Sequence, residues 1–286
     1  MKTYTKTVPD QEKTKLQQAP IEAKIEKTKE IIKAAYEHFS TDDMAVAWTG
    51  GKDSTLMLWL VKQVADELGQ PIPRCEFINE GDVFDEIWEF VDEWKEKWGL
   101  NVIVMHNEDV SKQAGGKIGE QVKVTDLNEL NQREVERLGY KGEFFPYEPE
   151  SFVGNHLMKT VMINQFVDNY NVKGYFAGIR WDEQEARADE TYFSPREKTD
   201  FNPDHIRVFP ILHFTEQDVW DAIHTLEIPY VKLYEQGYRS LGARVTTTKA
   251  DEKPAWEQDL ENTTERSGRR QDKENIMQRL RDLGYM

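Results

Sequence analysis

Six consecutive residues, 49–54, carry the clearest chemical potential in this chain, with the sequence Thr-Gly-Gly-Lys-Asp-Ser. Glycines let the backbone come close to an anion, and the first turn of a following helix has N–H groups without intrahelical partners. Lys52 adds a positive charge, and the hydroxyl groups of Thr49 and Ser54 add hydrogen-bond donors. This composition predicts a loop that binds phosphate groups.

The spacing separates this loop from the common P-loop. The pattern G-x-x-x-x-G-K-[ST] needs a glycine five residues before Gly51, and that position is Val46. The loop instead resembles the [ST]-G-G-x-D-S loop of the ATP pyrophosphatases, which holds the β- and γ-phosphates while the reaction takes place at the α-phosphorus. The structural alternative is an ordinary strand-to-helix turn capped by Asp53 or Ser54. A six-residue match in this context favours phosphate binding.

A second group of charged residues follows a later apolar run. Residues 178–183 read Gly-Ile-Arg-Trp-Asp-Glu, and Arg187 stands four residues further on. At the end of a strand, two arginines could bind a phosphate while two carboxylates bind its metal ion. A surface ion-pair network is the alternative, and the presence of the first loop makes it the weaker interpretation.

Apolar runs place these motifs in a sheet. The run at residues 44–48 predicts a buried strand before the loop, and the run at 55–61 predicts a helix after it. Further strands are predicted at residues 75–78, 101–105, 175–177 and 205–210. Strands and helices alternate as in an α/β protein with a doubly wound parallel sheet of about five strands. Ligands of such sheets bind beyond the carboxyl ends of the strands, where residues 49–54 and 79–81 fall.

The remaining segments suggest three parts. Residues 1–19 are polar and are expected to form a disordered tail. Residues 20–230 are expected to form an ATP-binding α/β domain with an insertion at about 107–152 that could cover a substrate. Residues 231–286 are expected to form a C-terminal extension that binds substrate and a partner. Short helices are predicted at residues 126–138 and 273–283 and, with Thr215 as N-cap and Asp218 three residues on, at 219–226.

Composition limits the function classes. The net charge of −16 over 286 residues argues against a general surface for nucleic acid or an anionic membrane. No run approaches about 18 apolar residues and residues 1–10 show no apolar signal region, so a cytoplasmic protein is expected. Cys75 is the single cysteine, which excludes a disulfide or a thiolate metal cluster within the chain. A buried structural thiol is favoured there.

Together the motifs resemble the phosphoadenosine phosphosulfate reductase superfamily, and within it the small, catalytic subunit of bacterial sulfate adenylyltransferase. The resemblance runs from about residue 30 to the C terminus, except for the insertion, and implies an adenine nucleotide α-hydrolase-like fold. The matching residues are 49–54; 79–81 with Phe84 and Glu86; His156 and 158–160; Gly178, Arg180, Asp182, Glu183 and Arg187; 206–210, 215–218 and Trp220; 239–242; and 264–266, 268–269 and 284–285.

Departures from the family pattern bear on the activity. The usual loop serine is Thr49, and Asn79 stands where the family has aspartate. Trp181 replaces the second arginine of Gly-Ala-Arg-Arg-Asp-Glu. Ala243 follows Ser-Leu-Gly where related members have cysteine. The reductases of the superfamily need a cysteine nucleophile, so reductase chemistry is excluded, and iron–sulfur versions lack ligands.

The resemblance implies adenylyl transfer, in which a sulfate oxygen attacks the α-phosphorus of ATP and pyrophosphate leaves. Catalysis of this kind needs positioning and charge neutralisation rather than a protein nucleophile. The resemblance also implies Mg²⁺ and a regulatory GTPase partner, because the family couples the uphill formation of the sulfate–phosphate anhydride to GTP hydrolysis. A homo-oligomer is compatible with it.

Site residues follow from these motifs. Asp53 is the expected contact to Mg²⁺, through water. The expected catalytic residues are Lys52, Arg180, Asp182 and Arg187. The expected nucleotide-binding residues are Thr49, Gly50, Gly51, Lys52, Asp53, Ser54, Asn79, Gly178, Arg207, Arg239 and Arg244.

Two alternatives stay open. Residues 229–242 also resemble the eukaryotic-type FAD synthetases, which would make the protein an FMN adenylyltransferase. Residues 264–270 favour the sulfate branch instead. The second alternative is a nucleotide-binding regulatory protein without turnover, suggested by Asn79 and Trp181. The intact set of Lys52, Asp53, Arg180 and Asp182 argues against it.

Overall fold

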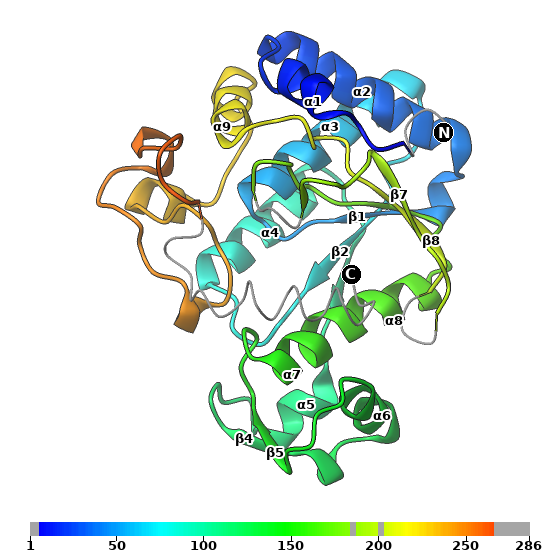
Figure 1. The fold of residues 1–286 in the computed structure, drawn as a ribbon, viewed down its shortest axis with the longest axis vertical. Helices are drawn as coiled ribbons and strands as arrows, with labels where there is room; N and C mark the ends of the chain where they lie inside the picture. The colour runs from blue at the N-terminus through cyan, green and yellow to red at the C-terminus, as the bar shows by residue number, and fades with distance from the viewer. Residues whose placement is uncertain (1–5, 184–186, 200–202, 266–286) are drawn as a thin grey trace.

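A six-stranded sheet forms the centre of the protein, shown in Figure 1 as a computed structural model that describes residues 6–183, 187–199 and 203–265. The strand order is β3-β2-β1-β6-β8-β7. The strands are β1 (Met44–Ala47), β2 (Arg74–Ile78), β3 (Val102–Met105), β6 (Gly174–Phe176), β7 (Phe193–Arg196) and β8 (His205–Val208).

Five of these strands are parallel, which confirms the predicted doubly wound α/β fold. The sixth strand, β7, pairs antiparallel with β8 and was not predicted. Its sequence, Phe-Ser-Pro-Arg, has neither an apolar run nor alternation, and Pro195 cannot donate a ladder hydrogen bond. Such a strand is tolerated because β7 lies at the edge of the sheet.

Helices cover both faces of the sheet. Helices α2, α3 and α9 contact one another on one side, and α8 contacts β2 and β3 on the other. Figure 1 shows the strands between these two layers. The helices of the α/β part are α1 (Asp10–Gln17), α2 (Ile21–His38), α3 (Lys52–Leu68), α4 (Asp85–Lys97), α8 (Val161–Asn169) and α9 (Glu216–Thr225).

Strand β1 shows how the sequence divides its side chains between the two layers. Met44, Val46 and Trp48 belong to the main core, which includes residues of α2, α3 and α4. Ala45 and Ala47 belong to a smaller cluster with residues of α8. Alternate residues of a strand point to opposite faces, so a strand buried on both sides reads as one apolar run. That run is what made β1 predictable.

The ends of two helices follow local signals. Helix α3 ends at Gly69, whose φ of 62° is a left-handed conformation that glycine adopts without strain. Helix α9 begins with the predicted cap: the Thr215 hydroxyl accepts from the Asp218 N–H, and the Asp218 carboxylate accepts from the Thr215 N–H. These caps fix where each helix starts or stops against the sheet.

Part of the expected disordered tail is ordered. Residues 10–17 form α1, which starts after Pro9 and has Asp10 and Glu12 in its first turn. The ammonium group of Lys13 donates to the Ala188 carbonyl at 2.7 Å. The prediction missed this helix because its composition is polar, and the contact that holds it is distant in sequence.

The insertion has a core of its own. It contains α5 (Glu108–Gln113), α6 (Glu129–Arg137), α7 (Phe152–Asn155) and a hairpin of β4 (Gln121–Lys123) and β5 (Phe144–Pro146). Figure 1 shows these elements together, on the side of the molecule away from α2. The helix predicted at 126–138 corresponds to α6. A π-helical turn, η3 (His156–Thr160), leads from α7 into α8.

Short 3₁₀ turns make up much of the remainder. They are η1 (Thr41–Asp43), η2 (Val124–Asp126), η5 (Lys232–Gln236), η6 (Arg244–Thr246) and η7 (Ala255–Glu257). The helix predicted at 273–283 lies outside the described residues. Among the helices that the structure describes, none has both the length and the apolar character needed to span a membrane.

Candidate active site

The predicted phosphate loop connects β1 to α3 at the carboxyl edge of the sheet. Gly50 has φ 74°, a conformation that favours glycine, and Gly51 is the N-cap of α3. The Thr49 and Ser54 hydroxyl groups lie 3.0 Å apart, and the Ser54 hydroxyl accepts from the Thr49 N–H at 3.2 Å. The Lys52 N–H donates to the Tyr234 hydroxyl at 2.9 Å. The loop is thus held from inside and by the C-terminal part of the chain.

Lys52 lies behind the loop in a buried ionic environment. Its side chain is 2% exposed, and Nζ donates to Glu265 Oε1 at 2.5 Å and to the Arg239 carbonyl at 3.2 Å. A Glu216 oxygen lies 3.6 Å from the same nitrogen. Burial acts to lower the pKa of Lys52, but the charges of Glu265 and Glu216 outweigh it and the pKa is raised. Lys52 is therefore a fixed cation.

Arg180 joins three carboxylates. Nε donates to Asp182 at 2.9 Å, Nη2 donates to Glu265 at 2.6 Å, and Nη1 pairs with Asp53. The side chain of Arg180 is fully buried. Burial opposes the charge, yet Glu265 and Asp182 together raise the pKa of Arg180. Burial likewise raises the pKa of Asp182, with Arg180 acting in the opposite direction.

Helix α9 extends this ionic network. Its first residue, Glu216, donates its backbone N–H to Asp182 at 2.9 Å and accepts from Arg239 at 2.8 Å through its carboxylate. Both Glu216 and Arg239 are buried. Four carboxylates thus face three cations within one network: Asp53, Asp182, Glu216 and Glu265 against Lys52, Arg180 and Arg239.

A cavity of about 310 Å³ opens beside the loop. It lies over the carboxyl ends of β1, β2 and β6, as the doubly wound topology predicts for a ligand site. Loop residues form one wall, apolar side chains another, and Arg187 and Arg207 also reach the surface of the cavity. The lining includes Thr49, Gly51, Lys52, Asp53, Ser54, Ile78, Val83, Ile163, Ala177 and Gly178.

Gly178 brings the end of β6 against the loop. A β-carbon at this position would lie 2.8 Å from the Asp53 carbonyl oxygen and 3.0 Å from the Ser54 nitrogen. Any larger residue would therefore push β6 away from the start of α3. The predicted pairing of the two motifs depends on this close approach.

Six expected site residues do not line the cavity: Gly50, Asn79, Arg180, Asp182, Arg239 and Arg244. Asp182 and Arg239 belong to the ionic network described above. Arg180 lies behind Asp53, as described above. Asn79 turns its side-chain oxygen to the Gly81 N–H at 3.0 Å and so caps its own turn. The Arg244 side chain is 52% exposed, with Nε 3.7 Å from Asp82.

Prediction from sequence missed several residues of the site. Tyr234, Glu216 and Glu265 all contact the loop or its lysine, and Glu76 lies in the cavity floor. A signal existed for Glu76, because a carboxylate inside an otherwise apolar strand is costly to bury. Tyr234 belongs to the segment that resembles the FAD synthetases, but nothing local shows that it reaches the loop across 182 residues.

A divalent metal would have few protein ligands here. Among the described residues, no group of three or more His, Cys, Asp or Glu side chains is arranged to hold a metal ion. Mg²⁺ often needs only one or two carboxylates, because it keeps waters and binds substrate phosphates. The Asp53 carboxylate is 18% exposed at the cavity wall, so it fits this limited role.

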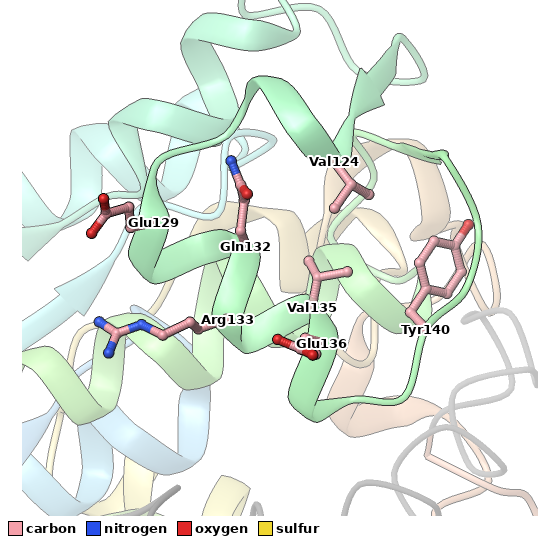
Figure 2. Close-up of a pocket in the computed structure, with 7 residues that line it drawn as sticks. All are labelled: Val124, Glu129, Gln132, Arg133, Val135, Glu136 and Tyr140. Atoms are coloured by element: carbon pink, nitrogen blue, oxygen red, sulfur yellow. The ribbon is translucent and has the colours of Figure 1, made fainter.

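A second hollow, of about 530 Å³, lies on the insertion. Its lining comes from α6 and the turns on either side of it, as Figure 2 shows. Arg133 is the single cation in that lining, beside Glu129 and Glu136. None of its residues belongs to a motif or to the carboxyl edge of the sheet. The smaller cavity at the loop is therefore the candidate active site.

Fold and site define an α/β protein of the adenine nucleotide α-hydrolase-like class. More particularly, the chain belongs to the phosphoadenosine phosphosulfate reductase domain family, whose sequence profile matches residues 43–249. This confirms the resemblance inferred from the motifs.

Curated relatives are similar to this chain in sequence, and a solved structure shares its fold. The chain is 29% identical over 213 residues to sulfate adenylyltransferase subunit 2 of Geotalea daltonii, covering 68% of this chain and 61% of that protein. It is 27% identical over 224 residues to the same subunit of Brucella anthropi, covering 72% and 63%. The chain thus spans about three fifths of the length of these relatives. The FMN adenylyltransferase of Candida glabrata shares the fold, with a TM-score of 0.62, 16% identity and 91% and 94% coverage.

Proposed function

We propose that this protein is a nucleotidyltransferase that cleaves ATP between the α- and β-phosphates and forms adenylyl sulfate from ATP and sulfate, releasing pyrophosphate. One observation carries the proposal: the glycine loop and the buried Lys52 lie beside a cavity at the carboxyl edge of a parallel sheet. The name of the relatives, sulfate adenylyltransferase subunit 2, supports sulfate as the acceptor.

The loop would hold the β- and γ-phosphates. Its backbone N–H groups and the hydroxyl groups of Thr49 and Ser54 lie at the start of α3, where the helix dipole favours an anion. Lys52 would neutralise the pyrophosphate that leaves. Mg²⁺ would be held by Asp53, directly or through water, together with phosphate oxygens, and would neutralise part of the phosphate charge.

The transfer step needs no protein nucleophile. A lone pair of a sulfate oxygen forms a bond to the α-phosphorus, the bond from that phosphorus to the bridging oxygen breaks, and pyrophosphate takes the electron pair. Arg187 and Arg207 line the cavity and would stabilise charge on the α-phosphate or sulfate. Arg180 would act through Asp53 and Glu265, which it orients.

Thiol chemistry has no support in this arrangement. Cys75 is fully buried in the core between the sheet and α3, away from the cavity. Burial raises its pKa to about 12, so the thiolate form is scarce at neutral pH.

A partner subunit also belongs to this proposal. The relatives are each named as subunit 2, which implies at least one other subunit in those enzymes. We infer that this chain, too, acts with a second subunit, and that a GTPase would supply the free energy for the uphill anhydride.

FMN is the second acceptor to test. Ser240, Leu241 and Gly242, which belong to the segment that resembles the FAD synthetases, line the cavity near Tyr234. Their position at the candidate site supports FMN as an acceptor to test.

The decisive experiment measures pyrophosphate release from Mg-ATP with sulfate, with FMN and without acceptor, each with and without a candidate GTPase and GTP. Release that requires sulfate is the expected result, and Lys52→Ala should abolish it. Release with FMN alone would establish the second acceptor. ATP binding without release under any condition would support a regulatory protein and overturn the proposed activity.

A further inference from the structure

The floor of the cavity contains a buried carboxyl group with one unpaired oxygen. Glu76 lies in β2, is 2% exposed and lines the cavity. Its Oε2 accepts a hydrogen bond from the Tyr175 hydroxyl group, whereas Oε1 is closed to water and has no hydrogen-bond partner among the described residues. An unpaired buried polar atom is costly, and few persist in native proteins without a reason. A hydrogen-bond donor on a ligand would supply the missing partner.

The register of the sheet places this carboxyl group beside the phosphate loop. Ala47 pairs with Glu76 across β1 and β2, and the loop begins with Thr49, two residues after Ala47. The neighbours of Glu76 in β2, Cys75 and Phe77, pack into the core on the α3 side, so Glu76 points to the face that α8 covers. A nucleotide whose phosphates lie at the loop can therefore reach Glu76 with its base.

The chemistry of the walls suits a flat heterocycle. Ile163 and Ala177 line the sides, where an apolar ring face can pack. Tyr175 and Arg207 are paired neighbours in β6 and β8, and they line the same face as Glu76. A base that binds against this floor would thus contact the Glu76 carboxyl group, an acceptor that the Tyr175 hydroxyl holds in place.

The protonation of Glu76 is consistent with a ligand donor. Burial raises its pKa to about 7, whereas the hydrogen bond from Tyr175 and the charge of Arg207 act to lower it. An N–H group at Oε1 would stabilise the ionised form in the same way. The torsion that turns the carboxyl plane of a glutamate is soft, so the group can adjust to a ligand at little cost.

We propose that Glu76 recognises the 6-amino group of adenine and so selects ATP over nucleotides with a 6-oxo purine. This inference rests on the proposed use of ATP as substrate. The 6-amino group donates hydrogen bonds, whereas the 6-oxygen of guanine or hypoxanthine accepts them. A 6-oxo base would place its 6-oxygen, an acceptor, against the carboxylate oxygen, also an acceptor, and both would stay unpaired. Unpaired buried polar groups of this kind are what make a site reject an analogue. Tyr175 is a positioning residue, since it fixes the carboxyl group that makes the contact.

The test compares binding of ATP and of inosine triphosphate by calorimetry. The wild-type protein should prefer ATP by at least about tenfold. In Glu76→Gln, Tyr175 still donates to the side-chain oxygen, so the amide nitrogen faces the base and donates to a 6-oxygen. The preference for ATP should fall at least about tenfold in this variant, with inosine triphosphate binding as well as before or better.

Three further variants separate recognition from folding. Glu76→Met keeps the length of the side chain without polar atoms and should bind both nucleotides alike. Tyr175→Phe removes the hydroxyl that fixes the carboxyl group and should weaken the preference for ATP, but less than the Glu76 variants do, because Oε1 remains. Glu134→Gln removes a buried carboxylate of the insertion, outside the cavity, and should leave the ratio of the two affinities unchanged. Thermal melts establish that each variant is folded.

The outcomes distinguish this inference from the proposed function. Equal loss of both nucleotides in the Glu76 variants, or a ratio that does not change, overturns the inference and leaves ATP as substrate. A wild-type protein that binds no ATP overturns the proposed function and this inference with it.

Discussion

Replacing Glu265 with Gln is expected to destabilise the free protein and to tighten nucleotide binding at the same time. Glu265 bridges Lys52 and Arg180 at 2.5 and 2.6 Å, and its side chain is 8% exposed. These cations neighbour the loop that would hold phosphate. The charges of Arg180 and Lys52 lower the pKa of Glu265 against the effect of burial, so this carboxylate is ionised at neutral pH. Glu265 therefore competes with phosphate for Lys52 and Arg180.

The size of both effects follows from the ion pairs that Glu265 makes. Breaking a buried ion pair by removing one partner costs about 3 to 5 kcal/mol. Glutamine still accepts a hydrogen bond, and Asp182 and Glu216 still balance the cations. We therefore expect the free energy of unfolding to fall by about 2 kcal/mol. For a chain of this size that lowers the melting temperature by about 4 °C. Loss of the competing charge should tighten pyrophosphate and Mg-ATP binding by a similar free energy, about 30-fold.

Thermal melts and calorimetric titration with pyrophosphate and Mg-ATP measure both effects in one preparation. Glu134→Gln is the matched control, because Glu134 is a buried carboxylate paired with Arg137 at 2.5 Å in the insertion. It should lower the melting temperature without changing nucleotide affinity. Weaker nucleotide binding in Glu265→Gln would refute the competition argument. It would show instead that Glu265 orients Lys52 and Arg180 for the substrate.

Three further expectations follow from single contacts. Cys75 is fully buried, so its thiol should not react with Ellman's reagent until denaturant unfolds the protein. Rapid reaction of the native protein would contradict this burial. Tyr234→Phe removes the hydroxyl that accepts from the Lys52 N–H, and chemical denaturation should show a loss of about 1 kcal/mol together with weaker pyrophosphate binding. Burial lowers the pKa of His213 to about 4, below its ordinary value of about 6.5. The folded state therefore binds fewer protons than the unfolded state, and the stability from neutral His213 is complete above pH 6.5 and is lost as the pH falls towards 4. His213→Gln should flatten melting temperature against pH in that range, and an unchanged slope would show that His213 does not titrate there.

The sheet could be predicted because its strands are buried on both faces. Such strands read as apolar runs, and the alternation with helices fixes parallel order. Strand β7 and helix α1 were missed because neither has an apolar pattern. Strand β7 is held by its pairing with β8, the next strand, and α1 by the contact of Lys13 with Ala188, 175 residues away. The fold of the insertion was missed because its hairpin strands are three residues each.

From the sequence, only the site residues that belong to a recognised motif could be predicted. Lys52 and Asp53 lie where the loop motif places them, beside Gly178 of the second motif. The pairing of cations with carboxylates was beyond a sequence argument, because Glu216 and Glu265 reach Lys52 from 164 and 213 residues away. The sequence shows which charges exist, and the fold decides which of them meet.

The ionic network also bears on the order in which substrates bind. Lys52 and Arg180 are desolvated when the protein folds, and carboxylates balance them, so an anion that enters at the loop must replace Glu265 rather than fill a bare cationic site. A polyphosphate can do so, because it brings several charges and the loop N–H groups hold it. Sulfate alone brings fewer charges and has no such loop.

We therefore expect ATP to bind before sulfate. Sulfate at millimolar concentration should raise the melting temperature when a nonhydrolysable ATP analogue is present, and should have little effect alone at the same ionic strength, matched with chloride. The analogue alone should stabilise the protein because it replaces Glu265 without help. Equal stabilisation by sulfate with and without the analogue would refute this order, since it would mean that sulfate binds at its proposed cations, Arg187 and Arg207, before the nucleotide arrives.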